Sequence, residues 1–158
     1  VLGIDLQPGE VRIAEVALRG GRPTLLKTGS APLPDTAIHM GVVAEPGTVA
    51  QTIRGILETM GAKPGLRAVY GVPAEACVLA GFLRSPGAQH NYLKLHRIGR
   101  QVDEGGTPVA VVGAEEHVIA AIRATADMAG VPIAAIEPAS WALLRTSALA
   151  MGASAAFH

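Results

Sequence analysis

Aromatic residues and net charge are scarce in this sequence of 158 residues. Phe, Trp and Tyr make up 3% of the chain, and Lys plus Arg equals Asp plus Glu at 13 each, so the formal net charge is zero. Nucleic-acid-binding domains usually carry a clear basic excess, so nucleic acid is not expected as a partner. Hydrophobic residues make up 49% and charged residues only 16%, which favours a folded core over a disordered chain.

Cysteine and long apolar runs are also lacking. The single Cys77 excludes an internal disulfide, and its apolar neighbours favour a buried structural thiol in a reducing cytoplasm. No run reaches the roughly 20 apolar residues that span a bilayer. The segment Val1–Asp5 carries no basic leader of a secretory signal. Any role at a membrane is therefore expected to depend on a partner.

Motifs for metal binding and nucleophilic catalysis are absent. His90 and His96 lie in an irregular stretch, the other histidines are scattered, and no pair has the i, i+4 spacing of a helical metal site. No Gly-x-Ser-x-Gly nucleophile elbow occurs. We therefore expect no metal site and no enzymatic nucleophile of that type.

The first part of the chain has the pattern of three antiparallel strands. Residues 1–7, 10–18 and 22–33 are rich in apolar and β-branched residues, and the turn signals Pro8-Gly9 and Gly20-Gly21 separate them. Two strands joined by a tight turn form a hairpin. The sequence therefore predicts a β-meander.

A helix and two strands are expected next. Between Pro46 and Met60, apolar residues recur at three- and four-residue spacing, which is typical of an amphipathic helix. Proline is tolerated in the first turn, and Gly61 marks the end. Apolar runs at 66–72 and 76–83 predict strands.

The rest of the chain predicts a linker and a second unit. Residues 85–108 are the least regular, and suggest at most a short helix over 92–98. Strands are then expected at 109–112 and 133–136, alternating with helices at 114–129 and 138–150. The predicted parts are a core lobe over 1–84, an irregular linker or diverged segment over 85–108, and a small β-α-β-α subdomain over 109–158 whose last helix returns toward the core lobe.

Three segments together resemble a known family. Gly3-Ile4-Asp5-Leu6, followed by a turn and Val11-Arg12, resembles the first phosphate loop of actin-like and Hsp70-like proteins. His39–Pro46 resembles the helix entry of the PilM and FtsA branch. The segments similar to that branch's extra subdomain are Val109–Val118, Gly130–Pro132 and Ile136–Ser140. The sequence is thus similar to PilM-like type IV pilus assembly proteins, which are actin-like and related to FtsA.

The resemblance implies an α/β (α+β) fold with an actin-like, RNase H-like core lobe and an inserted small β-α-β-α subdomain. Two departures accompany it. Residues 85–108 lack the long acidic helix usual in the family, and no Asp-x-Gly phosphate loop follows the subdomain. The chain therefore looks like the first half of a PilM-like molecule.

The resemblance also implies a nucleotide loop, which is degenerate here. Backbone N–H groups of glycine-containing hairpins clasp the phosphates in such proteins. Pro8 lacks that N–H, Gln7 replaces the usual glycine, and Glu10 places negative charge where phosphate would lie. We therefore expect no ATPase and no cofactor in this chain, whereas ATP with Mg²⁺ stays open for a full-length relative. The candidate cofactor-binding residues are Asp5, Gln7, Gly9 and Arg12.

The family resemblance further implies a peptide groove. PilM-like proteins bind the short cytoplasmic tail of a bitopic partner, PilN, between the core lobe and the extra lobe. Trp141, the only tryptophan, is either a core residue or a wall of that groove. The candidate groove residues are Phe82, Arg84, Trp141 and Leu144.

The function implied is that of a cytoplasmic scaffold or adaptor for pilus assembly, twitching or DNA uptake, at the inner face of the bacterial inner membrane. Its expected partners are a PilN-like tail, the pilus motor ATPase and a second copy of itself. The alternative is an ATP-binding actin-like enzyme or an ATP-switched filament protein. Membrane tethering in the manner of FtsA is disfavoured, because residues 148–158 contain no Lys or Arg.

Overall fold

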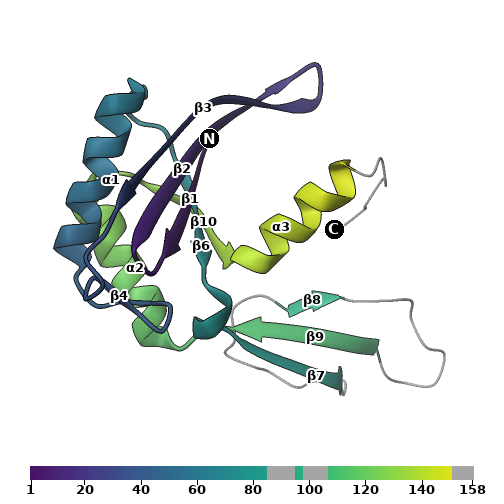
Figure 1. Cartoon of the computed structure of the whole chain (residues 1–158). Helices are drawn as coiled ribbons and strands as arrows, with labels where there is room; N and C mark the ends of the chain where they lie inside the picture. Colours follow the sequence, from purple (N-terminus) through teal and green to yellow (C-terminus); the bar gives the residue numbers. More distant parts are fainter. Residues whose placement is uncertain (85–94, 98–106, 151–158) are drawn as a thin grey trace.

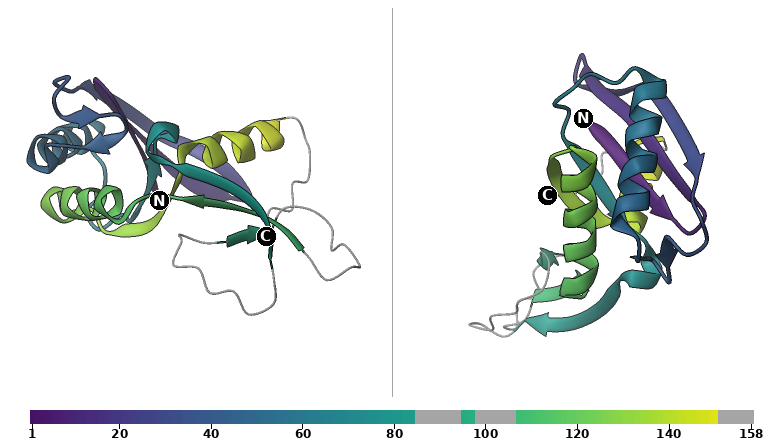
Figure 2. Two further views of the ribbon diagram at one scale, coloured as in Figure 1. Left: turned by 90° about the horizontal axis from the view of Figure 1, so that it is seen from below. Right: turned by 90° about the vertical axis from the view of Figure 1, so that its left-hand side faces the viewer.

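The computed structural model describes residues 1–84, 95–97 and 107–150, and a five-stranded sheet lies at its centre (Figure 1). The strand order across this sheet is β10-β6-β1-β2-β3. Helices α1 and α2 lie together on one face, and α3 lies on the other side (Figure 1, Figure 2). The bounds are β1 Leu2–Gln7, β2 Glu10–Arg19, β3 Arg22–Pro32, β6 Ala68–Val72, β10 Ile133–Pro138, α1 Pro46–Met60, α2 Glu116–Ala129 and α3 Ala139–Ala150.

The predicted β-meander is confirmed. β1 and β2 are antiparallel and join through Pro8-Gly9, and β2 and β3 pair as far as Arg19 opposite Arg22. The two residues between them, Gly20 and Gly21, have φ of 58° and 77°. A two-residue hairpin loop with positive φ at both positions matches the right-handed twist of its strands, and glycine adopts that conformation at little cost.

Helix α1 is also confirmed, and its apolar face packs on the sheet. It ends at Gly61, whose φ of 58° lies in the left-handed region and whose N–H donates to the Glu58 carbonyl at 3.0 Å. Lys27 of β3 donates through Nζ to the Gly61 carbonyl at 2.6 Å, a favourable place for a cation because it is the negative end of the helix dipole. The residues that α1 buries are Val49, Ala50, Ile53 and Ile56.

Strands β6 and β10 extend the sheet in parallel orientation. β6 pairs with β1, and β10 pairs with β6. Of the two, β6 is alternately buried and partly buried, whereas β10 is partly or fully exposed along its length. Tyr70 of β6 is fully buried, and its hydroxyl donates to the Val131 carbonyl at 3.4 Å. Burial, with a smaller contribution from Asp127, raises the pKa of Tyr70.

A second, three-stranded antiparallel sheet projects from the core (Figure 1, Figure 2). Its strand order is β7-β9-β8. β8 falls where the sequence suggested a short helix over 92–98, because Leu95 and its neighbours pair with β9 instead. The bounds are β7 Val78–Arg84, β8 Leu95–Arg97 and β9 Thr107–Gly113. Three shorter elements complete the order: β4 Ile38–His39 and β5 Val42–Val43 precede α1, and η1 Ala74–Ala76 lies between β6 and β7.

The predicted separate subdomain over 109–158 needs correction. β9 belongs to the small sheet, whereas β10 joins the core sheet beside β6. The physical reason lies in α2, whose apolar face would stay exposed on a lone β-α-β-α unit and instead packs against α1 and the core. The small sheet therefore takes β7 from before the predicted linker, β8 from within it, and β9 mostly from after it.

One charged side chain lies on the buried face of the sheet. Glu15 of β2 continues the inward alternation of Val11 and Ile13, and it is only 8% exposed. Within the described residues its Oε2 atom has no hydrogen-bond partner. An unpaired buried carboxylate oxygen costs free energy of folding. The fold is therefore less stable with Glu15 than it would be with an apolar residue at this position.

Candidate functional site

The predicted nucleotide residues lie at the β1–β2 hairpin and on the sheet face that α1 and α2 leave uncovered. Asp5 is the cross-strand partner of Arg12 and the parallel neighbour of Gly71. Gln7 donates from Nε2 to the Asp5 Oδ1 at 3.0 Å, in a partly buried position. Asp5 thus already accepts a hydrogen bond from the residue that replaces the usual glycine.

Arg12 is engaged by Glu10 of the same strand. Arg12 Nε donates to Glu10 Oε2 at 2.7 Å, and Nη2 of the same guanidinium lies 2.6 Å from that oxygen. Hydrogen bonds from Arg12 and then Ser30 lower the pKa of Glu10, and the bond to Glu10 raises the pKa of Arg12. The guanidinium of Arg12, which could bind a phosphate, is therefore paired with a carboxylate of its own hairpin. The turn of this hairpin is formed by Pro8 and Gly9, and Gly9 has a φ of 81°.

This pairing predicts a pH-dependent change confined to the hairpin. The pKa of Glu10 is lowered in the folded state, so its pairing with Arg12 stabilises the hairpin above the ordinary carboxyl pKa and is lost as pH falls through the lowered value. An NMR titration of the Glu10 carboxyl carbon is expected to give a midpoint below 4.5, the ordinary value. Arg12→Gln should move that midpoint back up. A midpoint unchanged in Arg12→Gln would show that the pair does not form in solution.

Helix α3 begins beside the Asp5 carboxylate. A Cβ atom placed on Gly71 would lie 3.6 Å from Asp5 Oδ1 and 3.4 Å from the Cβ of Ala139, the first residue of α3. An ion pair holds the helix: Arg145 Nη2 contacts both carboxylate oxygens of Glu137, and its distance to Oε2 is 2.5 Å. Glu137 is the last residue but one of β10, so this ion pair joins α3 to the core sheet.

The ion pair was not foreseen from the sequence, although a signal was present. Arg145 lies four residues after Trp141 and therefore on the same helix face. Glu137 lies two residues before Ala139, where the helix begins, and Arg145 reaches back to it from that face. Opposite charges on a strand and on the helix that follows it indicate an ion pair of this kind between the two elements.

The predicted groove residues divide into two groups. Trp141 is partly buried and Leu144 is 52% exposed, and both lie on α3. Phe82 and Arg84 lie on β7, where their backbones pair with Val109 and Thr107 of β9. The side chains of Phe82 and Arg84 lie outside the part of the chain that is described. α3 and the small sheet project from the same side of the core (Figure 1, Figure 2).

A cavity of about 290 Å³ lies away from both predicted sites. It opens between the C-terminal ends of α1 and α2, and its lining includes Arg54, Glu58 and Lys63 beside apolar side chains such as Leu57 and Leu66. No group of three or more His, Cys, Asp or Glu among the described residues could hold a metal ion. Over the same residues, no helix has both the length and the apolar character to cross a bilayer.

Comparison with solved structures gives three informative likenesses. A chain of the PilM-PilN type IV pilus biogenesis complex matches with a TM-score of 0.82 and 20% sequence identity, covering 95% of this chain and 50% of that chain. The ethanolamine utilization protein EutJ from Carboxydothermus hydrogenoformans matches with a TM-score of 0.52 and 12% identity, over 92% of this chain and 39% of that chain. No protein-family model and no curated protein matches the sequence.

The third likeness is to the cytoplasmic domain of EpsL, an inner membrane component of the type II secretion system of Vibrio cholerae. Its TM-score is 0.52 at 12% identity, over 87% of this chain and 56% of that chain. These likenesses establish the fold, so the predicted α/β class and the resemblance to a PilM-like fold are confirmed. The chain spans between 39% and 56% of the length of the three solved chains.

Proposed function

We propose that this chain is part of a scaffold of type IV pilus assembly that captures the cytoplasmic tail of an inner-membrane partner. The observation that carries the proposal is the likeness to a chain of the PilM-PilN complex over 95% of this chain. That coverage includes the core sheet, the small sheet and α3 together. The likeness to the cytoplasmic domain of an inner membrane secretion component supports the same setting, at the inner face of the bacterial inner membrane.

The proposed mechanism is apolar peptide capture without a chemical step. α3 is joined to the core through Glu137 and Arg145, and on the face that also carries Trp141 it exposes Leu144 by 52%. Burying one such leucine side chain in an interface is worth about 1.5–3 kcal/mol. The side of the core from which α3 and the small sheet project is therefore the surface that we assign to the tail.

The geometry of the β1–β2 hairpin favours this mechanism over ATP hydrolysis. Arg12 is paired with Glu10, Gln7 is bonded to Asp5, and Pro8 offers no N–H. We therefore propose that this chain does not act as an ATPase. The alternative, an ATP-switched actin-like protein, predicts Mg-ATP binding and thermal stabilisation by the nucleotide, so one titration can decide between the two.

The test is calorimetric titration of the protein with the N-terminal tail peptide of a PilN-like protein, and separately with Mg-ATP. We expect binding heat from the peptide. Tight ATP binding together with no peptide heat would refute the scaffold proposal. A motor ATPase and a second copy of the chain are further proposed partners, which pull-down with the purified motor and sedimentation analysis address separately.

Two neighbouring leucines on α3 locate the peptide surface. Leu144→Ser is expected to weaken peptide binding about tenfold, because it removes an apolar side chain from the helix face assigned to the groove. Leu143→Ser is the matched control, since Leu143 lies on the same helix, is also exposed, and points about 100° away around the axis. Both positions are exposed, so unfolding should not confuse the result. Equal losses in both variants would contradict the assigned face.

A further inference from the structure

The hairpin formed by β2 and β3 extends beyond the rest of the core sheet. Val16 exchanges backbone hydrogen bonds with Val1 at 2.9 and 3.0 Å, and among the described residues no third strand pairs with residues 17–24. In Figure 1 this end of the hairpin points away from α1, toward the upper right of the view. We call residues 16–26 the hairpin arm. The exposed fractions given for it refer to the described residues.

The hairpin arm exposes large apolar side chains. Leu18 is 75% exposed, Leu25 60% and Leu26 38%. Leu18 pairs with Pro23, and Val16 pairs with Leu25, so alternation brings these apolar residues to one face of the arm. Leu26 is the extra residue at the register shift after Glu15. Exposed leucines clustered at a protruding tip indicate a contact surface.

The same arm carries two arginines opposite each other. Arg19 and Arg22 are cross-strand partners on either side of the Gly-Gly turn, and like charges placed directly opposite destabilise a hairpin. Residues 16–34 contain no Asp or Glu. Within the described residues, neither arginine forms an ion pair or a side-chain hydrogen bond. An anionic partner would relieve this repulsion.

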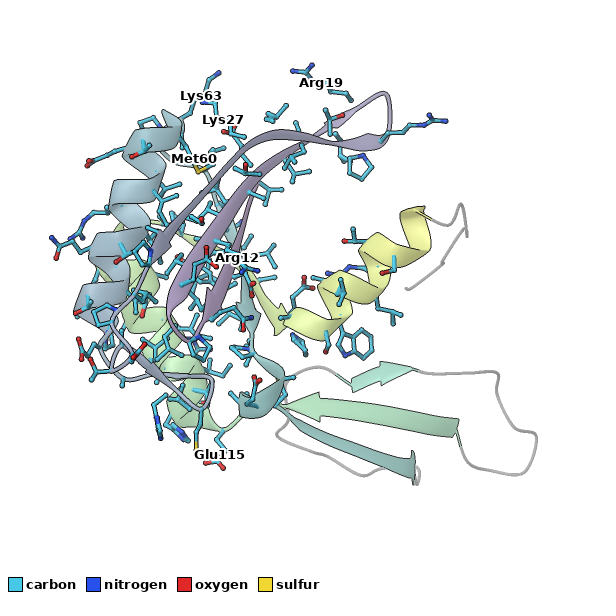
Figure 3. The ribbon with its side chains drawn as sticks, in the orientation of Figure 1. Arg12, Arg19, Lys27, Met60, Lys63 and Glu115 are labelled. Atoms are coloured by element: carbon cyan, nitrogen blue, oxygen red, sulfur yellow. The ribbon has the colours of Figure 1, made fainter. Side chains whose placement is uncertain are left out.

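Helix dipoles account for other basic residues nearby, but not for these two. Lys27 donates to the Gly61 carbonyl at the end of α1, and Arg54 donates to the Met128 carbonyl near the end of α2. Both cations thus satisfy helix C-termini. Figure 3 shows Arg19 on the hairpin, apart from the helix ends near Lys27 and Lys63. The arginines of the arm have no such internal role.

We propose that the hairpin arm contacts the surface of an anionic lipid bilayer. Its guanidinium groups would bind lipid phosphates, for which their planar donor geometry is suited. Its leucines would enter the boundary between headgroups and acyl chains, as apolar side chains of interfacial segments do. Both chemistries occur within eleven residues at one tip, and a bilayer surface offers both at once. This inference does not depend on capture of a partner tail.

Vesicle sedimentation tests the proposal. We expect the protein to sediment with vesicles of phosphatidylcholine containing a third phosphatidylglycerol, and not with pure phosphatidylcholine. Each basic side chain near an anionic surface contributes about a fivefold change in partitioning, so Arg22→Glu should weaken binding at least tenfold. Binding should also fall as salt rises, because the surface potential is screened within about 10 Å at 0.1 M salt.

Three further measurements make the test decisive. Arg123→Glu is the matched charge reversal on the exposed face of α2, and it should leave sedimentation unchanged. Leu18→Ser should weaken vesicle binding without changing the net charge. Sedimentation that Arg22→Glu and Leu18→Ser leave intact would overturn the assignment to the arm. Equally tight binding to soluble polyglutamate would overturn the lipid assignment, since it would show an acidic peptide to suffice.

Discussion

Gly29→Ala is expected to lower the free energy of unfolding by about 1–3 kcal/mol, which is the usual cost of overpacking. A Cβ atom at Gly29 of β3 would lie 2.6 Å from Ile56 Cγ2 and 2.9 Å from both Cγ and Sδ of Met60. These atoms belong to α1, so the helix approaches the strand where the strand has no side chain. Heat or urea unfolding followed by circular dichroism measures the loss.

The two contacts at Gly29 differ in how well they can give way. Met60 is unbranched and can change rotamer at little cost. Ile56 is β-branched, only 4% exposed, and nearly fixed in a helix, so it cannot move without shifting α1. The strain should therefore fall on Ile56. The double variant Gly29→Ala/Ile56→Ala is expected to lose less stability than the sum of the two single variants.

Gly55 provides a control with the opposite sign. It lies within α1 on an exposed position, and a Cβ atom there meets nothing within 4 Å. Gly55→Ala is therefore expected to stabilise the protein by about 0.5–1 kcal/mol through helix propensity alone. If Gly29→Ala were as well tolerated as Gly55→Ala, the close packing of α1 on β3 would be refuted.

Local patterns predicted the elements of this fold well. The meander and α1 followed from turn residues and apolar spacing, because a Pro-Gly or Gly-Gly pair and a 3.6-residue period each act over a few residues. Gly61 marked the end of α1 because only a residue without a Cβ adopts φ of 58° there at little cost. Each of these signals lies within the residues that form the element itself.

Long-range pairing was less predictable. Whether β10 would pair with β6 or with β9 depends on where α2 buries its apolar face. That choice involves α1, which ends at Met60, far along the chain from the start of α2 at Glu116. Glu15 shows the same limit on a smaller scale. Its charge predicts exposure, but the alternation set by Val11 and Ile13 places it inside.

The candidate site was predictable only in part. Asp5, Gln7 and Arg12 do lie together at the β1–β2 hairpin, because a tight antiparallel turn fixes their register. Their actual partners, Gln7 on Asp5 and Glu10 on Arg12, depend on side-chain rotamers that spacing does not reveal. The groove residues Phe82 and Arg84 stay predictions, since their side chains lie outside the described part.

Arg145→Met is expected to loosen α3 and to weaken tail binding about tenfold. Glu137 is 22% exposed and its carboxylate is held by Arg145, which is 42% exposed. Methionine keeps much of the apolar stem but removes the guanidinium, so a largely buried carboxylate loses its partner. The expected loss of stability is about 1–2 kcal/mol, reduced by the partial exposure of the pair.

A double-mutant cycle separates the ion pair from its surroundings. Glu137→Gln/Arg145→Met should recover much of the stability lost in Arg145→Met, because no unpaired charge is then left in place. Arg123→Met is the matched control, since Arg123 and Glu116 lie 3.5 Å apart on the exposed face of α2 and such exposed pairs contribute little to stability. If Arg145→Met lowered the free energy of unfolding but left peptide affinity unchanged, the ion pair would hold α3 without positioning it for the tail. The groove would then have to lie elsewhere. If peptide affinity and stability fell together in Arg145→Met and both recovered in the double variant, the Glu137–Arg145 ion pair would be what connects the folded core to partner capture.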